Sequence, residues 1–323
     1  MRFRRIGKSG VIVSEIGFGV WTITTGWWGK YEKSQAIRLL RKALEWGITF
    51  YDTADTYADG AGEEILKEAF DDNIKNITIA TKFGYNFYEH SKDRKGHSEI
   101  PQRWDIEYFQ KALENSLRRL GREWIDLYQL HNPKMDAINN DELFEELFKQ
   151  KKKGTIRAIG VALGPAIGWY EEGRVSILTR NVDAVQTVYN MLEQTPGKYF
   201  LQMCKQTGSS ILVRVPHCSG LLEGKYNENT EFKPDDHRSF RPKEWLTKGL
   251  KIVEDLSRYT KTNRTLGQLA LQYILEEECI ASVLPNIYDE EQMREFVEYE
   301  DAPALSEREK HELNMYLLRN QIS

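Results

Sequence analysis

Three short apolar runs of this chain each end in a polar side chain that can hold or move a proton. The first run ends at Asp52, and Tyr57 follows five residues later; the next two runs end at Lys82 and at His131. If the runs are consecutive strands of one parallel barrel, the four side chains meet at one mouth. An acid, a phenol, an amine and an imidazole together suit proton donation to a carbonyl oxygen.

Each of these four side chains has a role in such chemistry. A tyrosine with an unperturbed pKa of ~10 is a poor acid at neutral pH. A nearby ammonium lowers that pKa, so we expect Lys82 to activate Tyr57. Asp52 offsets the cost of burying the ammonium, and His131 orients the carbonyl by a hydrogen bond. Taken singly, each residue is better explained by a structural role, as a turn cap, a surface ring, a solvated strand end or a turn histidine. Their shared position at strand ends favours the catalytic interpretation.

The segments that must position these residues alternate between strand-like and helix-like patterns. Most strand-like runs are continuously apolar, which is typical of strands buried on both faces. We expect strands at Glu15–Gly19, Thr49–Ala54, Ile77–Lys82, Ile125–His131, Ile156–Ala162, Ala184–Asn190, Ser210–Pro216 and Ala281–Asn286. We expect helices at Ser34–Trp46, Glu63–Phe70, Ile106–Leu120, Asp141–Lys153, Tyr199–Gln206, Lys243–Tyr259 and Leu266–Glu277. Such an alternation over about 250 residues or more predicts an α/β fold, the (β/α)8 TIM barrel.

The main alternative fold is a doubly wound open sheet, and the first strand argues against it. That sheet usually carries a glycine-rich dinucleotide motif opening a helix. Here Gly17-Phe-Gly19 leads into aromatics and an irregular loop. We expect residues 1–323 to form a single barrel domain with an N-terminal β-hairpin over 3–14. The long irregular segments Asn86–Arg103 and Pro216–Pro242 follow strands, so we expect both on the catalytic face.

Composition excludes several other classes. The chain has 323 residues, of which 40% are hydrophobic, and a net charge of -4, without the basic surplus typical of nucleic-acid binding. No apolar run approaches membrane-spanning length, and the N-terminus lacks a signal-peptide core. Three widely spaced cysteines, Cys204, Cys218 and Cys279, show no metal-ligand spacing. We therefore expect a cytoplasmic protein with no metal, no membrane partner and no nucleic-acid partner; its oligomeric state stays open.

Longer motifs around these residues resemble those of the aldo-keto reductase superfamily over nearly the whole chain. The resemblance implies a (β/α)8 barrel that transfers a hydride from NAD(P)H to an aldehyde or ketone. It also implies a catalytic tetrad of Asp52, Tyr57, Lys82 and His131, with Tyr57 as the proton donor. The matching motifs are Trp46-Gly-Ile-Thr-Phe-Tyr-Asp-Thr-Ala-Asp-Thr-Tyr57, Ile79-Ala-Thr-Lys82, Asp126-Leu-Tyr-Gln-Leu-His-Asn-Pro133, Gly154-Thr-Ile-Arg-Ala-Ile-Gly-Val161, Gln186-Thr-Val-Tyr-Asn190 and Gly220-Leu-Leu-Glu-Gly-Lys-Tyr226.

The same resemblance implies where cofactor and substrate bind. Tyr189 is expected to stack on the nicotinamide ring and Gln186 to bond its carboxamide. The loop after the seventh strand is expected to clamp the pyrophosphate. The cofactor set comprises Gly19, Trp21, Asp52, Gln186, Tyr189, Arg214, Pro216, Ser219, Gly220, Leu221, Lys225, Pro285 and Gln292. The substrate set comprises Trp21, Trp28, Tyr57, Tyr85 and His131.

Three departures from the family pattern bear on the cofactor. Ala162-Leu163 stands where Ser-Asn usually anchors the carboxamide. Arg214 either adds a cation beside the cofactor or substrate or pairs with a neighbouring acid, and the sequence favours neither. After Pro285, a basic partner for a 2′-phosphate is replaced by the acids of the run 289–291. The family favours NADP(H), whereas like-charge repulsion at these acids favours NAD(H) or the use of both.

Two other functions would also explain the main features of this sequence. A regulatory subunit with slow turnover could bind the cofactor to sense redox state. A TIM-barrel acid–base enzyme could use the tetrad without any nicotinamide.

Overall fold

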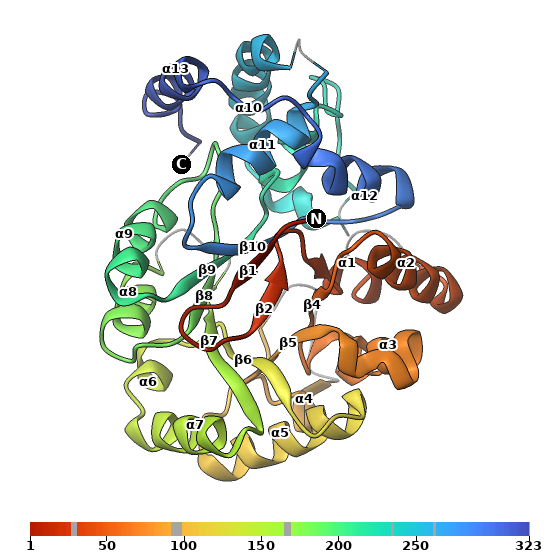
Figure 1. Cartoon of the computed structure of the whole chain (residues 1–323), viewed down its shortest axis with the longest axis vertical. Helices are drawn as coiled ribbons and strands as arrows, with labels where there is room; N and C mark the ends of the chain where they lie inside the picture. Colours follow the sequence, from red (N-terminus) through yellow and green to blue (C-terminus); the bar gives the residue numbers. More distant parts are fainter. Residues whose placement is uncertain (27–30, 92–98, 165–168, 234–235, 261–262, 323) are drawn as a thin grey trace.

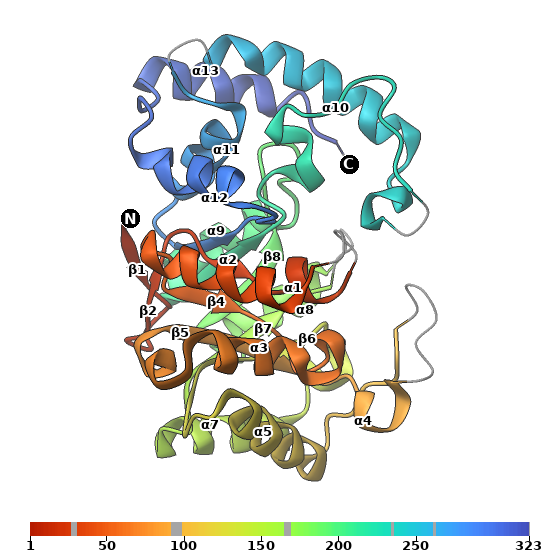
Figure 2. The same cartoon turned by 90° about the vertical axis from the view of Figure 1, so that its right-hand side faces the viewer.

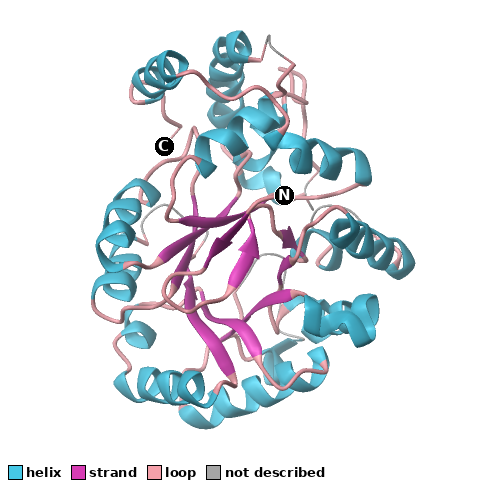
Figure 3. Cartoon of the chain, in the orientation of Figure 1, coloured by secondary structure: helices cyan, strands magenta, loops and turns pink. Residues whose placement is uncertain are grey.

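The protein is described by a computed structural model over residues 1–26, 31–91, 99–164, 169–233, 236–260 and 263–322. Its main sheet has eight parallel strands in chain order from β3 to β10. Figures 1 and 3 show them enclosed by helices, as expected for a (β/α)8 barrel. The strands are β3 (Phe18–Gly19), β4 (Phe50–Asp52), β5 (Thr78–Phe83), β6 (Ile125–His131), β7 (Ile156–Ala162), β8 (Ala184–Val188), β9 (Ser210–Arg214) and β10 (Ile280–Leu284).

The barrel is nearly closed between its first and last strands. Ile16 forms a parallel bridge with Val283, and the Val283 N–H donates to the Glu15 carbonyl at 2.8 Å. A separate antiparallel hairpin of β1 (Phe3–Arg5) and β2 (Ile12–Ser14) precedes the barrel. Figure 2 shows this hairpin at one end of the barrel and the α4 loop at the other. The hairpin therefore closes the end opposite the carboxyl ends of the strands.

Helices connect successive strands and cover the barrel. Their ends follow ordinary capping chemistry: the side chain of Asp105 accepts from the Tyr108 N–H, and Gly121 takes the left-handed conformation after that helix ends. The helices are α1 (Trp21–Thr24), α2 (Lys33–Glu45), α3 (Ala61–Phe70), α4 (Phe87–His90), α5 (Ile106–Leu120), α6 (Met135–Ile138), α7 (Asp141–Lys153), α8 (Tyr170–Leu178), α9 (Gly197–Thr207), α10 (Lys243–Leu256), α11 (Leu266–Leu275), α12 (Glu290–Val297) and α13 (Glu307–Leu317).

Two of these helices stand outside the regular ring. Figure 1 shows α10 and α13 at the top of the molecule. They enclose a second hydrophobic cluster with the β9 loop, in which Leu221 and Trp245 are buried. The long segment after β9 is thus packed against the molecule and holds the loop that should clamp the cofactor.

Side-chain alternation along the strands decides what faces the barrel interior. One interior layer contains Phe50, Ala80, Leu127, Ala158, Ala184 and Leu212, packed with the hairpin. Because side chains on one face recur every second residue, the next layer toward the mouth contains Asp52, Lys82, Gln129, Gly160, Gln186 and Arg214. The apolar floor therefore carries a polar layer directly above it.

Candidate active site

The predicted tetrad residues Asp52, Tyr57 and Lys82 are brought together in the polar layer. The Lys82 ammonium lies 2.5 Å from Asp52 Oδ1 and 3.3 Å from the Tyr57 hydroxyl oxygen. It also donates to the Thr53 carbonyl at 2.7 Å. Because Lys82 donates to the phenol oxygen, the hydrogen of Tyr57 stays available to another acceptor.

Two glutamines complete the surroundings of Asp52. Gln129 and Gln186 donate to Asp52 Oδ2 at 3.1 and 2.8 Å. The carboxylate is therefore fixed by three donors, which is how a buried charge is held in a low-dielectric interior. Gln129 was not singled out from the sequence, although its position two residues before His131 places it on the inward face of β6.

The electrostatics of Tyr57 differ from our expectation in their net direction. Burial raises the pKa of the Tyr57 hydroxyl, and the nearby charges of Lys82 and Arg214 only partly oppose this rise. Burial acts to lower the pKa of Lys82, but Asp52 and Tyr57 outweigh it and raise that pKa above its ordinary value. Lys82 therefore stays charged at neutral pH. As predicted, its charge acts to lower the pKa of Tyr57, but burial of the hydroxyl raises that pKa by more.

Aromatic rings border the space above Tyr57. Trp21 stacks beside Tyr57 with ring centroids 6.3 Å apart, and His131 meets the Tyr57 ring edge-on at 5.8 Å. Tyr85 meets His131 edge-on at 5.0 Å, and its hydroxyl accepts from Asn132 at 2.9 Å. Four of the five predicted substrate residues thus gather at one place; Trp28 lies outside the described residues.

The β9 loop carries unusual backbone geometry where the sequence predicts the pyrophosphate clamp. Val215, Cys218 and Ser219 have φ values of 57°, 48° and 54°, and Gly220 has φ 96°. Non-glycine residues adopt this region at a cost, and such strain clusters at ligand sites. A side chain at Gly220 would meet the Tyr226 hydroxyl oxygen at 2.2 Å. This irregular turn can present backbone N–H groups to an anion, so it fits a dinucleotide cofactor.

Residues from further along the chain hold this turn in place. The Tyr226 hydroxyl donates to the Ser219 carbonyl at 2.7 Å, and Arg241 donates to Ser219 Oγ at 3.0 Å. Arg241 is itself paired with Glu193 at 2.6 Å, and Arg238 donates to the Tyr226 hydroxyl at 2.7 Å. The two arginines were not predicted as site residues, because nothing in their local sequence shows which loop they contact.

The segment after β10 meets the clamp through a buried acid. Gln292 Nε2 donates to Glu223 at 2.8 Å, and Lys225 lies 3.5 Å from the same carboxylate. Burial raises the pKa of Glu223. Pro285 is buried, and its carbonyl oxygen lies 4.0 Å from where a side chain would begin at Gly19. The predicted cofactor residues of β3, β9 and β10 therefore border one another, and Glu223 is an acid that we had not considered.

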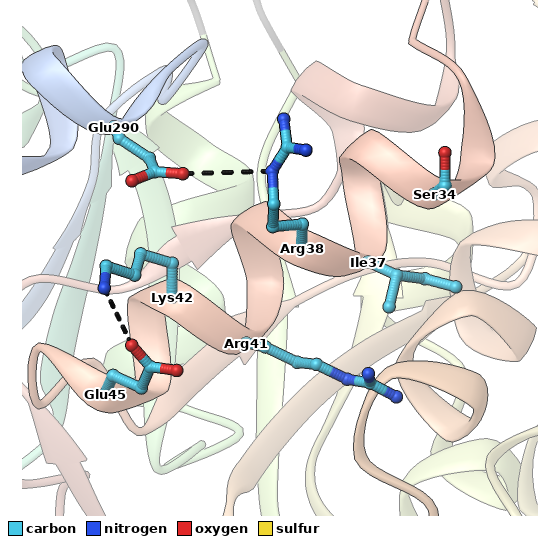
Figure 4. A pocket seen from close by; sticks show the side chains of 7 residues that line it. All are labelled: Ser34, Ile37, Arg38, Arg41, Lys42, Glu45 and Glu290. Atoms are coloured by element: carbon cyan, nitrogen blue, oxygen red, sulfur yellow. Dashed lines mark hydrogen bonds and ion pairs between the residues drawn. The ribbon is translucent and has the colours of Figure 1, made fainter.

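The negative charges of the acidic run 289–291 are partly offset by structural partners that the sequence does not reveal. Asp289 accepts from the Gln292 N–H and so caps α12. Figure 4 shows Glu290 pointing toward Arg38 of α2, with 3.9 Å between Oε1 and Nε. Helix α2 also supplies Lys42, which pairs with Glu45 at 2.9 Å in the same pocket. Two of the three acids thus have structural partners.

Tyr189 is not brought to the mouth, contrary to our expectation that it stacks on the nicotinamide. It follows the last residue of β8, Val188, and is buried in the main hydrophobic core. Its ring packs on Gly197 and borders a surface pocket with Tyr273 and Lys310. Leu163 likewise belongs to the outer core, so only Ala162 changes the chemistry of the inner surface.

Comparison with known proteins identifies the family. The family described as "Aldo/keto reductase family" matches residues 15–315. The chain belongs to the aldo/keto reductase family. It is 29% identical over 314 residues to "Uncharacterized oxidoreductase YqkF" of Bacillus subtilis (strain 168), covering 96% of this chain and 94% of that protein. It is 30% identical over 286 residues to "Aldo-keto reductase YhdN" of the same organism, covering 86% and 82%.

A solved structure supports the same assignment. The holo form of "aldo-keto reductase AKR11C1 from Bacillus halodurans" superimposes with a TM-score of 0.79 at 27% sequence identity, covering 98% of this chain and 96% of that one. The protein is therefore an oxidoreductase that uses NAD(P)H to reduce carbonyl compounds. In the described part of the chain, every helix is too short or too polar to cross a membrane.

Proposed function

We propose that Tyr57 protonates the carbonyl oxygen of an aldehyde or ketone while a hydride reaches the carbonyl carbon. The observation that carries this proposal is the series of contacts from the buried Asp52 through the buried Lys82 to the Tyr57 hydroxyl, at 2.5 and 3.3 Å. The reduced nicotinamide supplies the hydride. Lys82 stabilises the phenolate that remains, and Asp52 keeps Lys82 charged and oriented.

His131 and Trp21 position the substrate in this proposal. Both rings lie against Tyr57, so a carbonyl between them is held near the phenol oxygen. Positioning of this kind accelerates the reaction because it removes the need to orient the carbonyl at each encounter. Gln102 fixes the β6 end by donating to the His131 carbonyl at 2.8 Å.

For the nucleotide, we propose that the chain accepts NADH at least as well as NADPH. Glu223 places a buried carboxylate between the two loops that should straddle the adenosine half, and Gln292 provides no cation for a 2′-phosphate. Relatives differ on this point: one is named "NADH-specific methylglyoxal reductase" (Escherichia coli, 26% identical) and another "Aldo-keto reductase yakc [NADP(+)]" (Schizosaccharomyces pombe, 30% identical). Fluorescence titration with NADH and with NADPH measures the preference directly.

The test of the function is oxidation of NADH or NADPH by the purified protein with a panel of aldehydes and ketones, including methylglyoxal. We expect turnover with several of them. Tight nucleotide binding without turnover on any carbonyl would overturn the proposal and favour a regulatory subunit. Absence of nucleotide binding would favour a nicotinamide-free enzyme. That residues 1–323 act as one domain, in the cytoplasm, stays a prediction.

A further inference from the structure

His131 ends strand β6 at a point where that strand has lost one of its two neighbours. On the β7 side, His131 is still in register with Ala162. On the β5 side, the pairing ends one residue earlier, with Phe83 opposite Leu130. A backbone carbonyl that loses its strand partner in a buried place needs another donor. The donor must therefore come from outside the two strands.

The side chain of Gln102 supplies this donor. Its Nε2 donates to the His131 carbonyl at 2.8 Å and to the Asn132 carbonyl at 3.1 Å. Asn132 has a φ of 49°, in the left-handed region that non-glycine residues adopt at a cost. One amide group thus joins the last residue of the strand to the strained residue that follows it. Gln102 therefore fixes the backbone from which the imidazole extends.

Backbone pairing of the loop after β5 brings Gln102 to this place. The Arg103 N–H donates to the Gly84 carbonyl at 2.8 Å, and Tyr85 forms an antiparallel bridge with Gln102. The start and the end of the loop are therefore paired with each other directly beyond β5. Because backbone groups make this pairing, a substitution at Gln102 should remove the amide and leave the loop in place.

Tyr85 of the same pairing also borders the imidazole. Its ring meets His131 edge-on with centroids 5.0 Å apart, and its hydroxyl accepts from Asn132 Nδ2 at 2.9 Å. The centroid of the Tyr57 ring lies 5.8 Å from that of the same imidazole. The position of the imidazole relative to Tyr57 thus depends on the backbone that Gln102 holds. A misplacement of about 1 Å can lower a rate by ~10²-fold.

We propose that Gln102 is a positioning residue for carbonyl reduction. Its amide holds the backbone of His131 and Asn132, so that the imidazole meets the substrate oxygen beside Tyr57. This inference rests on the proposed function, in which His131 orients the carbonyl and Tyr57 protonates it. Both acceptors are carbonyl oxygens, so the role requires a donor at this position and not an amide in particular. A lysine, which has three donors on a flexible side chain, should therefore replace the glutamine.

The test removes the donor and then restores it. Gln102→Met keeps the length of the side chain without the donor, and we expect kcat/KM for methylglyoxal to fall about 10- to 100-fold. The dissociation constant of NADH, measured by fluorescence, should stay unchanged. Gln102→Lys should recover most of the lost kcat/KM.

A double-mutant cycle separates positioning of His131 from a general structural role. In a His131→Ala background the imidazole is absent, so Gln102→Met should lower kcat/KM by less than about two-fold. A merely structural role predicts the same fold loss with and without His131. That result, or a wild-type kcat/KM in Gln102→Met, would overturn the inference.

Gln272 of α11 offers a matched control. It likewise donates through Nε2 to two backbone carbonyls, those of Tyr299 and Ala302, at 3.1 Å each. Gln272→Met should lower the melting temperature about as much as Gln102→Met does and leave kcat/KM unchanged. If Gln102→Met does not fold, Gln102→Asn, whose amide is one methylene further from the carbonyls, takes its place. Absence of wild-type turnover would overturn the proposed function together with this inference, whereas wild-type turnover with an unaffected Gln102 variant overturns the inference alone.

Discussion

The two halves of the mouth are built differently. On the β4–β6 side, the buried Asp52 and Lys82 form an ion pair, and Lys82 also donates to the half-buried Tyr57. On the β7–β10 side, the backbone is strained at Val215, and the buried Nε of Arg214 has no hydrogen-bond partner among the described residues. The ion pair and hydrogen bonds of the side to which we assign proton transfer are thus formed without a ligand. On the β7–β10 side, we expect a bound ligand to interact with the Arg214 cation and the strained backbone at Val215.

The largest loss of activity is expected when the ion pair on the β4–β6 side is removed. Lys82→Met should reduce kcat by about 10²- to 10⁴-fold, because the phenolate of Tyr57 loses its cation. It should also lower the free energy of unfolding by about 3–5 kcal/mol, because Asp52 is left buried and unpaired. Steady-state kinetics and denaturant unfolding measure the two losses.

A second buried ion pair offers a matched control for this variant. Arg119 lies 2.6 Å from Glu63, outside the tetrad and equally buried. Arg119→Met should lose comparable stability while kcat falls far less. Equal losses of kcat in the two variants would mean that Lys82 acts only through folding.

On the β7–β10 side, we expect His217 to make the free energy of unfolding depend on pH. Burial lowers the pKa of His217 to about 4, and its ring stacks on Phe296 with centroids 4.4 Å apart. An unfolded histidine has a pKa of about 6.5, so between these values the unfolded state binds one more proton than the folded state. This residue therefore makes stability fall as pH drops from about 6.5 to 4, by up to ~1.4 kcal/mol per pH unit.

Replacing His217 separates its contribution from that of other groups. In His217→Leu, unfolding free energies measured at pH 7, 5.5 and 4.5 should show a shallower decline than in the wild type. The exposed His311 of α13 gives the control, and His311→Gln should leave the decline unchanged. Identical slopes in all three proteins would contradict the assignment.

Features that depend on neighbouring residues in the sequence could be predicted, whereas contacts between distant segments could not. The eight strands, and the meeting of Asp52, Tyr57, Lys82 and His131 at one mouth, follow from apolar runs that end in polar residues, which is a local pattern. Alternation along the expected strand Ala184–Asn190 would already have placed Tyr189 on the face opposite to Gln186. Helix α8 was missed because Tyr170–Leu178 is buried on several sides and shows no clear polar stripe.

The contacts of the cofactor half could not be predicted, because they join distant loops. Arg241 reaches Ser219 from a separate helical turn, and Arg38 approaches Glu290 from α2. Neither pairing can be recognised from the spacing of residues along the chain. Charge in the sequence alone therefore overstated the acidity beside Pro285 and missed Glu223.

A smaller effect should follow from restoring a family-typical donor. Ala162 faces the mouth in register with Gln186, so Ala162→Ser places a hydroxyl beside the expected carboxamide site. One added hydrogen bond of about 1 kcal/mol should tighten NADH binding roughly five-fold, measured by fluorescence titration. Ala158→Ser, two layers deeper on the same face of β7, should give no gain. Unchanged affinity in Ala162→Ser would place the carboxamide elsewhere.

The smallest effect concerns the choice of nucleotide. Glu223→Gln removes a buried negative charge and should shift the ratio of NADPH to NADH affinity toward NADPH by about three- to ten-fold. Glu290→Gln removes the same charge on the outer surface beside Arg38 and should leave the ratio unchanged. A shift of equal size in both variants would indicate long-range electrostatics and not a contact with the ribose.

The central claim, that Tyr57 donates the proton, is tested most directly by a stopped-flow measurement on Tyr57→Phe. The protein is mixed with saturating NADH and methylglyoxal, and the first turnover is followed by loss of nucleotide fluorescence. We predict an unchanged dissociation constant for NADH and a hydride-transfer rate lowered by at least about 100-fold. A first-turnover rate equal to that of the wild type would contradict the account.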